Sequence, residues 1–314
     1  MDTKLTAMMV DDFLHDPVLA AKVILGIHCP PHMEVALWSM WTKKFVIDHS
    51  GFGTGKTLRI AIVALLRAML MRNRTELFIS RSFAQATHQM HQPIRDWTRT
   101  RPIVRSQMKL SSTGRAPGVY SNDTWETPFA NGSIIRTVPP SFGSSGERVA
   151  GEDCTDGYFD EVTKYGDYIA FARQMLTRVR KPVDPAYGDA THVRPLHDDP
   201  IFGRHFFMAG TAKYTWHPMY SKVEAYREQV KGGSTQHDVI TFESNDIVRF
   251  FGTHPEYAEF TDLKAIKDLE VSLPRAEAEQ EVRGRWTKDS AGWYSHADVM
   301  AARRECVPIL IGRE

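Results

Sequence analysis

The segment that most constrains the fold is SGFGTGKT, residues 50–57, which lies between a β-rich run at 43–49 and a long apolar run at 57–72. Glycines in such a loop let the backbone turn so that successive N–H groups face an anion. A helix that begins directly after the loop adds its dipole and its free N–H groups. The strand–loop–helix order therefore predicts a phosphate-binding loop, and the alternative is a glycine-rich turn that happens to contain GKT.

The residue types within this loop predict individual roles. Lys56 would reach the β- and γ-phosphates of a nucleotide, and the Thr57 hydroxyl would coordinate Mg²⁺. The usual first glycine of the pattern is replaced by Ser50, and a glycine follows one place later. The residues predicted to bind nucleotide are Ser50, Gly51, Phe52, Gly53, Thr54, Gly55, Lys56 and Thr57.

A pair of adjacent carboxylates follows a second apolar strand about a hundred residues later. TDGYFDE, residues 155–161, ends in Asp160 and Glu161. In enzymes with a phosphate loop, an acid at a strand end supports Mg²⁺, and a neighbouring carboxylate orients and deprotonates the attacking water. The pair therefore predicts Asp160 near the metal and Glu161 as the catalytic base of a hydrolase, and the alternative is two solvated charges at a turn.

A third strand end, MAGT at 208–211, places another hydroxyl in a comparable position. If the strand lies beside the phosphate loop, Thr211 would sit near the γ-phosphate. The alternative is a strand that simply turns at Gly210, and composition does not choose between the two.

Alternation of strand and helix signals predicts an α/β fold with a mainly parallel central sheet flanked by helices. Segment 98–128 is polar and predicted to be irregular, and the chain becomes helical and charged from residue 255 onward. Predicted strands lie at 43–49, 75–82, 133–140, 155–161, 204–211 and 237–244, and predicted helices at 11–26, 33–43, 57–72, 83–97 and near 165–180.

Composition excludes several classes of protein. The 314 residues carry 39 Lys and Arg against 38 Asp and Glu, so the net charge of +1 argues against a dedicated, strongly basic DNA-binding domain. Its three cysteines, Cys29, Cys154 and Cys306, form no CxxC pair, which argues against a zinc ribbon or a disulfide framework. The longest apolar run, 60–66, is far shorter than the ~20 residues that span a bilayer, so no membrane association is expected.

Taken together, these segments resemble the ATPase domain of the large terminase subunit of tailed bacteriophages, a P-loop NTPase of the ASCE type. The resemblance covers most of the chain. It rests on SGFGTGKT, on NGSIIRTVPPSFGSSGERVAGEDCTDGYFDE at 131–161, on MAGT, and on EVRGRWTKDSAGWY at 281–294. It implies a motor that packages double-stranded DNA into a procapsid, with ATP and Mg²⁺ as cofactors.

The resemblance also implies roles for particular residues. Thr211 would couple hydrolysis to DNA movement, and Arg148 would reach the nucleotide of a neighbouring subunit. Many relatives carry a basic residue inside the phosphate loop and a glutamine that reads adenine. Here residues 51–54 are Gly-Phe-Gly-Thr, which favours Arg148 acting in trans, and the glutamine position falls near Met33, which would lie on the adenine side. An amphipathic core helix at 31–41 is the alternative for Met33.

The resemblance implies a particular organisation and setting. Residues 1–250 would form the ATPase domain, and 251–314 a small linker or lid subdomain that leads toward a nuclease domain absent from this chain, so no nuclease activity is expected. The implied partners are double-stranded DNA, the portal protein, the small terminase subunit and further copies of the chain in a ring. The implied location is the host cytoplasm, with transient docking on the procapsid.

Two further clusters invite interpretation. A basic stretch between residues 95 and 115 contains the candidate DNA-binding residues Arg99, Arg101, Arg105 and Lys109, for which an ordinary solvated face is the alternative. A second, weaker basic cluster consists of Arg173, Arg178, Arg180 and Lys181. His192, His197, Asp198, Asp199 and His205 match no common ligand spacing, so a metal site is not predicted there.

Two other functions remain open at this point. One is another P-loop enzyme that acts on nucleic acid in the manner of a helicase, or a small-molecule kinase. The chain is short for the two motor domains of a helicase, and a kinase does not need Glu161 beside Asp160. The other is a nucleotide-binding assembly module that hydrolyses poorly on its own.

Overall fold

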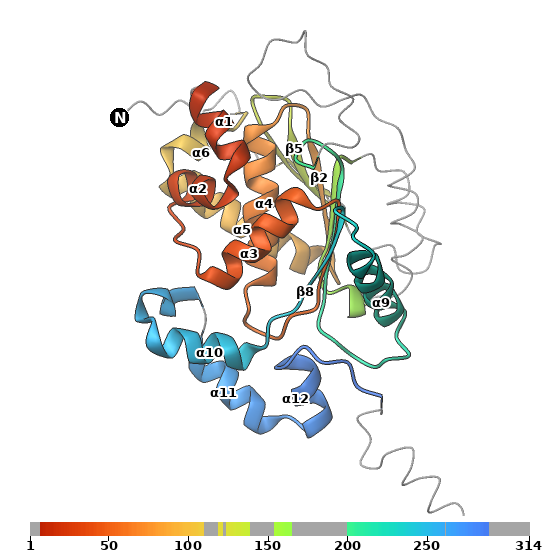
Figure 1. Cartoon of the computed structure of the whole chain (residues 1–314). Helices are drawn as coiled ribbons and strands as arrows, with labels where there is room; N and C mark the ends of the chain where they lie inside the picture. Colours follow the sequence, from red (N-terminus) through yellow and green to blue (C-terminus); the bar gives the residue numbers. More distant parts are fainter. Residues whose placement is uncertain are drawn as a thin grey trace, which may run out of the picture.

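A computed structural model describes residues 7–109, 119–121, 124–138, 154–164, 200–260 and 262–288. Within these residues the chain forms an 8-stranded sheet with helices on both faces (Figure 1). Arg148, the predicted helix near 165–180, the second basic cluster and all of the His/Asp cluster except His205 lie outside the described residues.

The described secondary structure follows the predicted alternation. The strands are β1 (Phe45–Asp48), β2 (Thr75–Ile79), β3 (Val119–Ser121), β4 (Thr124–Pro128), β5 (Ile134–Thr137), β6 (Asp156–Phe159), β7 (His205–Ala209) and β8 (His237–Ile240). The α-helices are α1 (Ala7–His15), α2 (Pro17–Ala20), α3 (Pro31–Thr42), α4 (Lys56–Leu70), α5 (Phe83–Thr100), α6 (Pro102–Gln107), α9 (Pro218–Lys231), α10 (Ser244–Thr253), α11 (Leu263–Ser272) and α12 (Arg275–Glu281). A π-helical turn η1 (Ala21–Leu25) and 3₁₀ turns η2 (Val162–Lys164) and η3 (Pro255–Phe260) complete them.

The strand order confirms the predicted α/β class. It runs β3-β4-β5-β2-β6-β7-β1-β8, and every neighbouring pair from β5 to β8 is parallel. β7 lies between β1, which leads into the phosphate loop, and β6, which leads into the carboxylate pair. An inserted strand at this place is the arrangement that defines the ASCE type of P-loop NTPase.

The helices form two layers and an end cap. In Figure 1, α3, α4 and α5 cover one face of the sheet, α9 covers the other, and α10 to α12 lie together at one end. α4 lies at the centre of the larger core, because every residue from Arg59 to Leu70 is buried. Such an all-round buried helix matches the continuous apolar run of the sequence.

One segment differs from the prediction. Residues 98–128 were expected to be irregular, yet α5 extends to Thr100, α6 follows, and β3 and β4 add an antiparallel edge to the sheet. β4 exists because it pairs with β5, with Trp125 opposite Thr137 and Pro128 opposite Ile134. The intervening turn is held by Asn131, whose amide donates to the carbonyls of Ala68, Met69 and Met71 at the end of α4. The α4 carbonyls that hold this turn are 60–63 residues away in the sequence, so a local pattern carries little trace of them.

The C-terminal helices begin earlier than the sequence suggested. The boundary drawn at residue 250 falls inside α10, which starts at Ser244 directly after β8. Among the described residues, no helix combines the length and the apolar character that crossing a bilayer requires.

Candidate nucleotide-binding site

The phosphate loop joins the carboxyl end of β1 to the first turn of α4. Gly53 and Gly55 have φ values of 74° and 83°, a left-handed conformation that glycine adopts without steric cost. Gly55 caps α4, so the free N–H groups of the helix face the loop interior. The Lys56 ammonium donates to the carbonyls of Ser50 and Gly51 at 2.6 and 2.8 Å, which folds the side chain back over the loop. The geometry is that of an anion-binding loop with its lysine in place.

The first half of the loop is bound to the C-terminal part of the chain. The Gly51 and Phe52 N–H groups donate to the carbonyls of Phe242 and Glu281 at 2.9 and 2.6 Å. The Ser50 hydroxyl accepts from the Phe242 N–H at 2.9 Å. A side chain at position 51 would collide with the Val282 carbonyl. These contacts explain why serine stands at position 50 and glycine at position 51. The Ser50 hydroxyl accepts a hydrogen bond, and no Cβ fits at position 51.

The structure brings the carboxylate pair to this loop. The Thr57 hydroxyl donates to Asp160 Oδ2 at 2.7 Å, across 103 residues of sequence. Burial raises the pKa of Asp160, while Thr57 and Lys56 act against that rise. A hydroxyl and a carboxylate at this separation are hard oxygen donors of the kind that Mg²⁺ prefers. The two side chains therefore fit the predicted Mg²⁺ site.

Glu161 has the features of a reactive carboxylate. Its φ of 55° is unusual for a residue with a side chain, and such strain collects at functional sites. Oε1 pairs with the Lys164 ammonium at 3.0 Å, whereas Oε2 is buried without a hydrogen-bond partner among the described residues. The two oxygens of this carboxylate thus differ, one being ion-paired and the other having no hydrogen-bond partner among the described residues.

Thr211 reaches the same edge of the sheet because β7 lies between β6 and β1. The Gly210 N–H donates to the Asp48 carbonyl at 3.0 Å, and a Cβ at position 210 would press on Val162 and Thr163 at 3.2–3.3 Å. The glycine thus lets the segment before Thr211 pass close to the turn that follows Glu161. That Thr211 sits near the γ-phosphate and couples hydrolysis to movement stays a prediction.

Met33 lies beside the loop but cannot have the predicted contact in this structure. Its sulfur is 3.7 Å from the place where a Cβ of Gly55 would lie, and its side chain is only 1% exposed. A buried side chain supports the loop and offers no face to a purine. The prediction that Met33 packs on the adenine therefore requires an exposure that the described structure does not give it.

The four candidate DNA-binding residues lie at the end of α5 and around α6, and their role stays a prediction. Arg99 is exposed and pairs with Asp96 at 3.2 Å. Arg101 is half-buried and packs its guanidinium over Gly26, whereas Arg105 and Lys109 are exposed. His205, the described member of the His/Asp cluster, contacts Asp156 at 3.2 Å.

Residues that the sequence analysis missed support the loop from behind. Asp48, the last residue of β1, accepts from the Ser50 N–H at 3.0 Å and is ion-paired to Arg59 of α4. Arg59 also donates to the Thr54 carbonyl at 3.0 Å. Both charged side chains interrupt apolar runs, which is the signal that could have identified them.

Two histidines, His32 (half-buried) and His49 (buried), contact the same region. His32 lies against Phe242 and Phe251, and burial together with the nearby Arg59 lowers its pKa to about 4. His49 contacts the Gly284 carbonyl at 3.0 Å and the Thr241 hydroxyl at 2.9 Å, and burial lowers its pKa to about 4 as well. Both rings are therefore neutral at neutral pH, and His49 ties the segment after α12 to the base of the loop.

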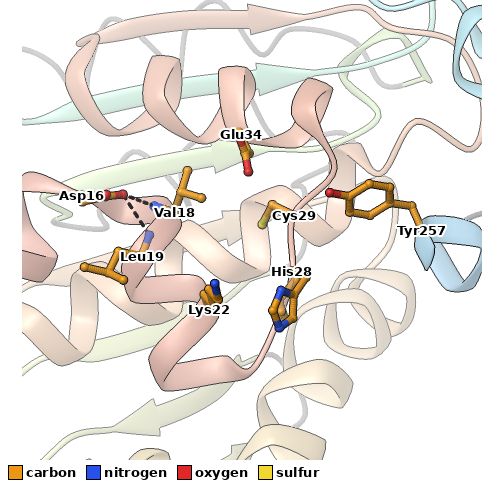
Figure 2. Close-up of a pocket in the computed structure, with 9 residues that line it drawn as sticks. Asp16, Val18, Leu19, Lys22, His28, Cys29, Glu34 and Tyr257 are labelled. Carbon is orange, nitrogen blue, oxygen red and sulfur yellow. Dashed lines mark hydrogen bonds between the residues drawn. The ribbon is translucent and has the colours of Figure 1, made fainter. Parts of the chain in front are cut away.

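A pocket of about 340 Å³ lies where the N-terminal segment meets η3 (Figure 2). Figure 2 shows the Tyr257 hydroxyl directed toward Cys29 and Glu34. Burial, and then the Glu34 carboxylate, raises the pKa of the Cys29 thiol to about 12, so the thiol is neutral. The lining residues are Asp16, Val18, Leu19, Lys22, Ile27, His28, Cys29, Glu34 and Tyr257. Glu34 lines the pocket, and the neighbouring Met33 lies beside Gly55 of the phosphate loop. The pocket and the loop therefore both adjoin the first turn of α3.

The strand order and the loop between β1 and α4 define the fold of P-loop NTPases of the ASCE type. No protein-family model matches the sequence, and no curated protein matches it in sequence. Solved structures, in contrast, share its fold. The chain is similar to the large terminase of bacteriophage HK97 with a TM-score of 0.58 and 10% identity, covering 87% of this chain and 55% of that one.

Two further large-terminase structures show the same likeness. The ATPase domain of the large terminase from Thermus phage P74-26 matches with a TM-score of 0.52 and 13% identity, covering 87% of this chain and 99% of that one. The large terminase of a thermophilic bacteriophage, solved in complex with ADP, matches with a TM-score of 0.53 and 11% identity, covering 82% of this chain and 54% of that one. This chain therefore has the fold of a large-terminase ATPase domain, and it spans about half the length of the HK97 protein and of the ADP-bound terminase.

Proposed function

We propose that this chain is the ATP-hydrolysing motor domain of a DNA-packaging terminase, which couples hydrolysis to movement of double-stranded DNA into a procapsid. The observation that carries the proposal is the 2.7 Å contact between Thr57 and Asp160, next to a Glu161 carboxylate with one unpaired oxygen. The shared fold supports the same assignment. The described residues contain no specific feature that favours the helicase-like alternative or the assembly module.

The proposed chemistry uses ATP and Mg²⁺. Lys56 would gather the β- and γ-phosphates, and Thr57 and Asp160 would hold the metal, which would neutralise the charge on the phosphates. Glu161 would accept a proton from the water that attacks the γ-phosphorus, and ADP and phosphate would leave. One large terminase that shares the fold, from a thermophilic bacteriophage, has been solved in complex with ADP.

The base of the nucleotide is proposed to enter the pocket beside η3. The Tyr257 ring offers an aromatic face, and the Glu34 carboxylate offers an acceptor for an amino group. This placement replaces the role first predicted for Met33, since Met33 is buried between the pocket and the loop.

The motor function brings further proposals about partners. Thr211 would couple the γ-phosphate to movement, and Arg148 would act on the nucleotide of a neighbouring copy in a ring. Arg99, Arg101, Arg105 and Lys109 are candidates for contacts with double-stranded DNA. The portal protein and the small terminase subunit would complete the assembly, in the host cytoplasm.

Replacing the loop lysine tests the nucleotide site. Lys56→Ala removes charge-assisted hydrogen bonds to phosphate, and we expect roughly 10- to 100-fold weaker binding of ATP·Mg²⁺ with loss of ATPase activity. Calorimetric titration with ATP·Mg²⁺ measures the binding, and Lys231→Ala, on the exposed surface of α9, is the control. Unchanged binding by the Lys56 variant would refute the nucleotide site.

A second experiment tests the motor. ATPase activity is measured alone, with double-stranded DNA, and with DNA plus procapsids that carry the portal. We expect stimulation by DNA and protection of DNA from nuclease only with procapsids. Stimulation by single-stranded nucleic acid without procapsid-dependent packaging would favour the helicase-like alternative.

A further inference from the structure

A fully buried ion pair lies directly beneath the phosphate loop. Asp48 ends β1, and its carboxylate and the Arg59 guanidinium are both 0% exposed. One carboxylate oxygen accepts from the Ser50 N–H at 3.0 Å, and the other pairs with Arg59. The two residues therefore connect the strand before the loop to the helix after it.

Arg59 also contacts the second half of the loop. Its guanidinium donates to the Thr54 carbonyl at 3.0 Å and lies 5.6 Å from the centre of the Phe242 ring. Asp48 thus holds the start of the loop, and Arg59 holds the turn before Gly55. The two contacts are thus made to the Ser50 N–H at the start of the loop and to the Thr54 carbonyl near its end.

The carboxylate creates an electrostatic problem for a site that binds a polyanion. Although burial opposes ionisation, Arg59 and Lys56 hold the pKa of Asp48 below its ordinary value, so the group is charged. A buried negative charge under the loop is screened very little by salt. It attracts the Lys56 ammonium and repels the phosphates that the loop would bind.

Arg59 offsets this repulsion because its guanidinium is paired with the Asp48 carboxylate. With Arg59 present, the Asp48 carboxylate is paired with a positive charge of its own, and it is one of three carboxylates, with Asp160 and Glu281, that act on Lys56. Lys56 bonds to the carbonyls of Ser50 and Gly51 at 2.6 and 2.8 Å, and no direct hydrogen bond joins it to Asp48 among the described contacts. Without Arg59, Asp48 and Lys56 would cancel, and the loop would lose its net charge toward phosphate.

We propose that Arg59 is a positioning residue that neutralises Asp48 and thereby leaves Lys56 free to bind phosphate, so that this buried pair sets the affinity of the loop for polyphosphate. The inference rests on the proposed nucleotide function. It adds an arginine that acts from behind the loop, in a chain whose loop itself contains none.

A charge cycle tests the proposal with inorganic tripolyphosphate and with ATP·Mg²⁺. Arg59→Met removes the charge but keeps a long side chain, and we expect at least about tenfold weaker binding of both ligands. Asp48→Asn alone is expected to bind as tightly as the parent or more tightly. The double variant has neither charge, and its affinity should return to within about threefold of the parent.

The cycle separates an electrostatic role from a scaffold role. The double variant lacks the ion pair and the Thr54 hydrogen bond, so a scaffold role predicts binding at least as weak as that of Arg59→Met. Recovery of affinity despite lower thermal stability would support the proposal, and failure to recover would overturn it. Arg59→Lys keeps the charge and should bind nearly normally, so loss equal to that of Arg59→Met would also overturn it.

Two controls complete the experiment. Arg67→Met removes another fully buried arginine of α4, which is paired with Asp156 far from the loop. It should lower the unfolding temperature without changing the affinity for tripolyphosphate, and a comparable loss of affinity would show that instability alone weakens binding. Lys56→Ala separates the two proposals, because the nucleotide site itself is refuted only if that variant still binds tripolyphosphate.

Discussion

At the residue scale, Glu161 is the side chain whose surroundings most clearly match its chemistry. It combines a left-handed backbone, an ion pair on one oxygen and no partner on the other among the described residues. Asp160, the preceding residue, instead has both oxygens engaged by Thr57 and by the Glu161 N–H. Two adjacent carboxylates are thus placed for different tasks.

Substitution of the two acids should separate those tasks. Glu161→Gln keeps the shape but cannot accept a proton, so we expect ATP·Mg²⁺ to bind normally while hydrolysis falls by about 10²- to 10⁴-fold. Asp160→Asn should instead raise the Mg²⁺ concentration needed for half-maximal activity. Single-turnover kinetics and a Mg²⁺ titration measure these effects. Equal and mild losses in both variants would show that the pair is not catalytic.

A second residue-level contrast lies at the opposite end of the strands. Arg67, Arg74, Asp156 and Glu76 are all fully buried there. Burial and the nearby Asp156 raise the pKa of Glu76 well above its ordinary value, whereas Arg67 and Arg74 overcome the effect of burial and hold that of Asp156 well below. The pKa values of the two acids in this network are thus shifted in opposite directions.

Conservative substitutions should therefore have unequal costs. Glu76→Gln replaces the acid whose pKa is raised with a neutral amide that can still accept from the Tyr158 hydroxyl, now at 2.8 Å from Glu76, and we expect less than about 1 kcal/mol of lost stability. Asp156→Asn leaves two buried arginines without their charged partner and should cost about 3–5 kcal/mol. Urea unfolding at pH 7.5 measures both. Equal costs would mean that Glu76 is ionised in the folded protein.

At the element scale, the C-terminal helices are bound to the phosphate loop and to the strand beside it. In the stretch after α12, the Val282 carbonyl lies against Gly51 of the loop, and the Gly284 carbonyl contacts His49. Within α12, Glu281 pairs with Lys213 at 2.6 Å. A bridge between Tyr214 and Thr287 continues this contact along the segment that follows Thr211. Nucleotide-dependent movement of the loop or of that segment would therefore displace α12.

The pocket between the N-terminal segment and η3 yields a prediction about the base of the nucleotide. Tyr257→Ala should weaken ATP binding by about tenfold, through loss of an aromatic face for the purine. Binding of inorganic tripolyphosphate should not change, because it uses only the loop. Calorimetry with both ligands measures the difference, and Trp38→Ala, on an exposed part of α3, is the control. An equal loss for both ligands would exclude the base from this pocket.

At the scale of the whole molecule, buried histidines make stability depend on pH. Burial lowers the pKa values of His32, His49 and His205 to about 4 and that of His91 to about 3. The folded protein therefore keeps these rings neutral, while the unfolded chain protonates them near pH 6.5. The stability they contribute is complete above pH 6.5 and is lost as the pH falls toward 4.

We expect the free energy of unfolding, measured by urea titration, to fall steeply between pH 7 and pH 4.5, by up to about 1.4 kcal/mol per pH unit for each titrating histidine. The raised pKa values of Glu76 and Asp160 increase the free energy of unfolding as the pH falls, which is the opposite effect. We expect the four histidines to outweigh these two carboxyls. His91→Gln can still bond the hydroxyls of Thr127 and Thr137, and it should reduce the slope. A flat profile would contradict the prediction.

Much of the site could be predicted from the sequence, because its parts are local. A strand, a glycine loop and a helix that adjoin in sequence must adjoin in space, so residues 50–57 identified the phosphate loop without tertiary information. The acids at 160 and 161 and the hydroxyl at 211 were recognised as strand ends, and parallel strands bring such ends to one edge. The alternation of elements likewise predicted the class of the fold.

Only the tertiary structure decided which of these residues touch, and what supports them. The contact between Thr57 and Asp160 depends on β1 and β6 ending at the same edge of the sheet, with only β7 between them, and pairing order is set by contacts across the whole chain. The antiparallel edge and the burial of Met33 have the same origin. Asp48 and Arg59 are only 11 residues apart, yet nothing local shows that their charges meet beneath the loop. Their pairing depends on the surrounding core, because only full burial forces the two charges to satisfy one another.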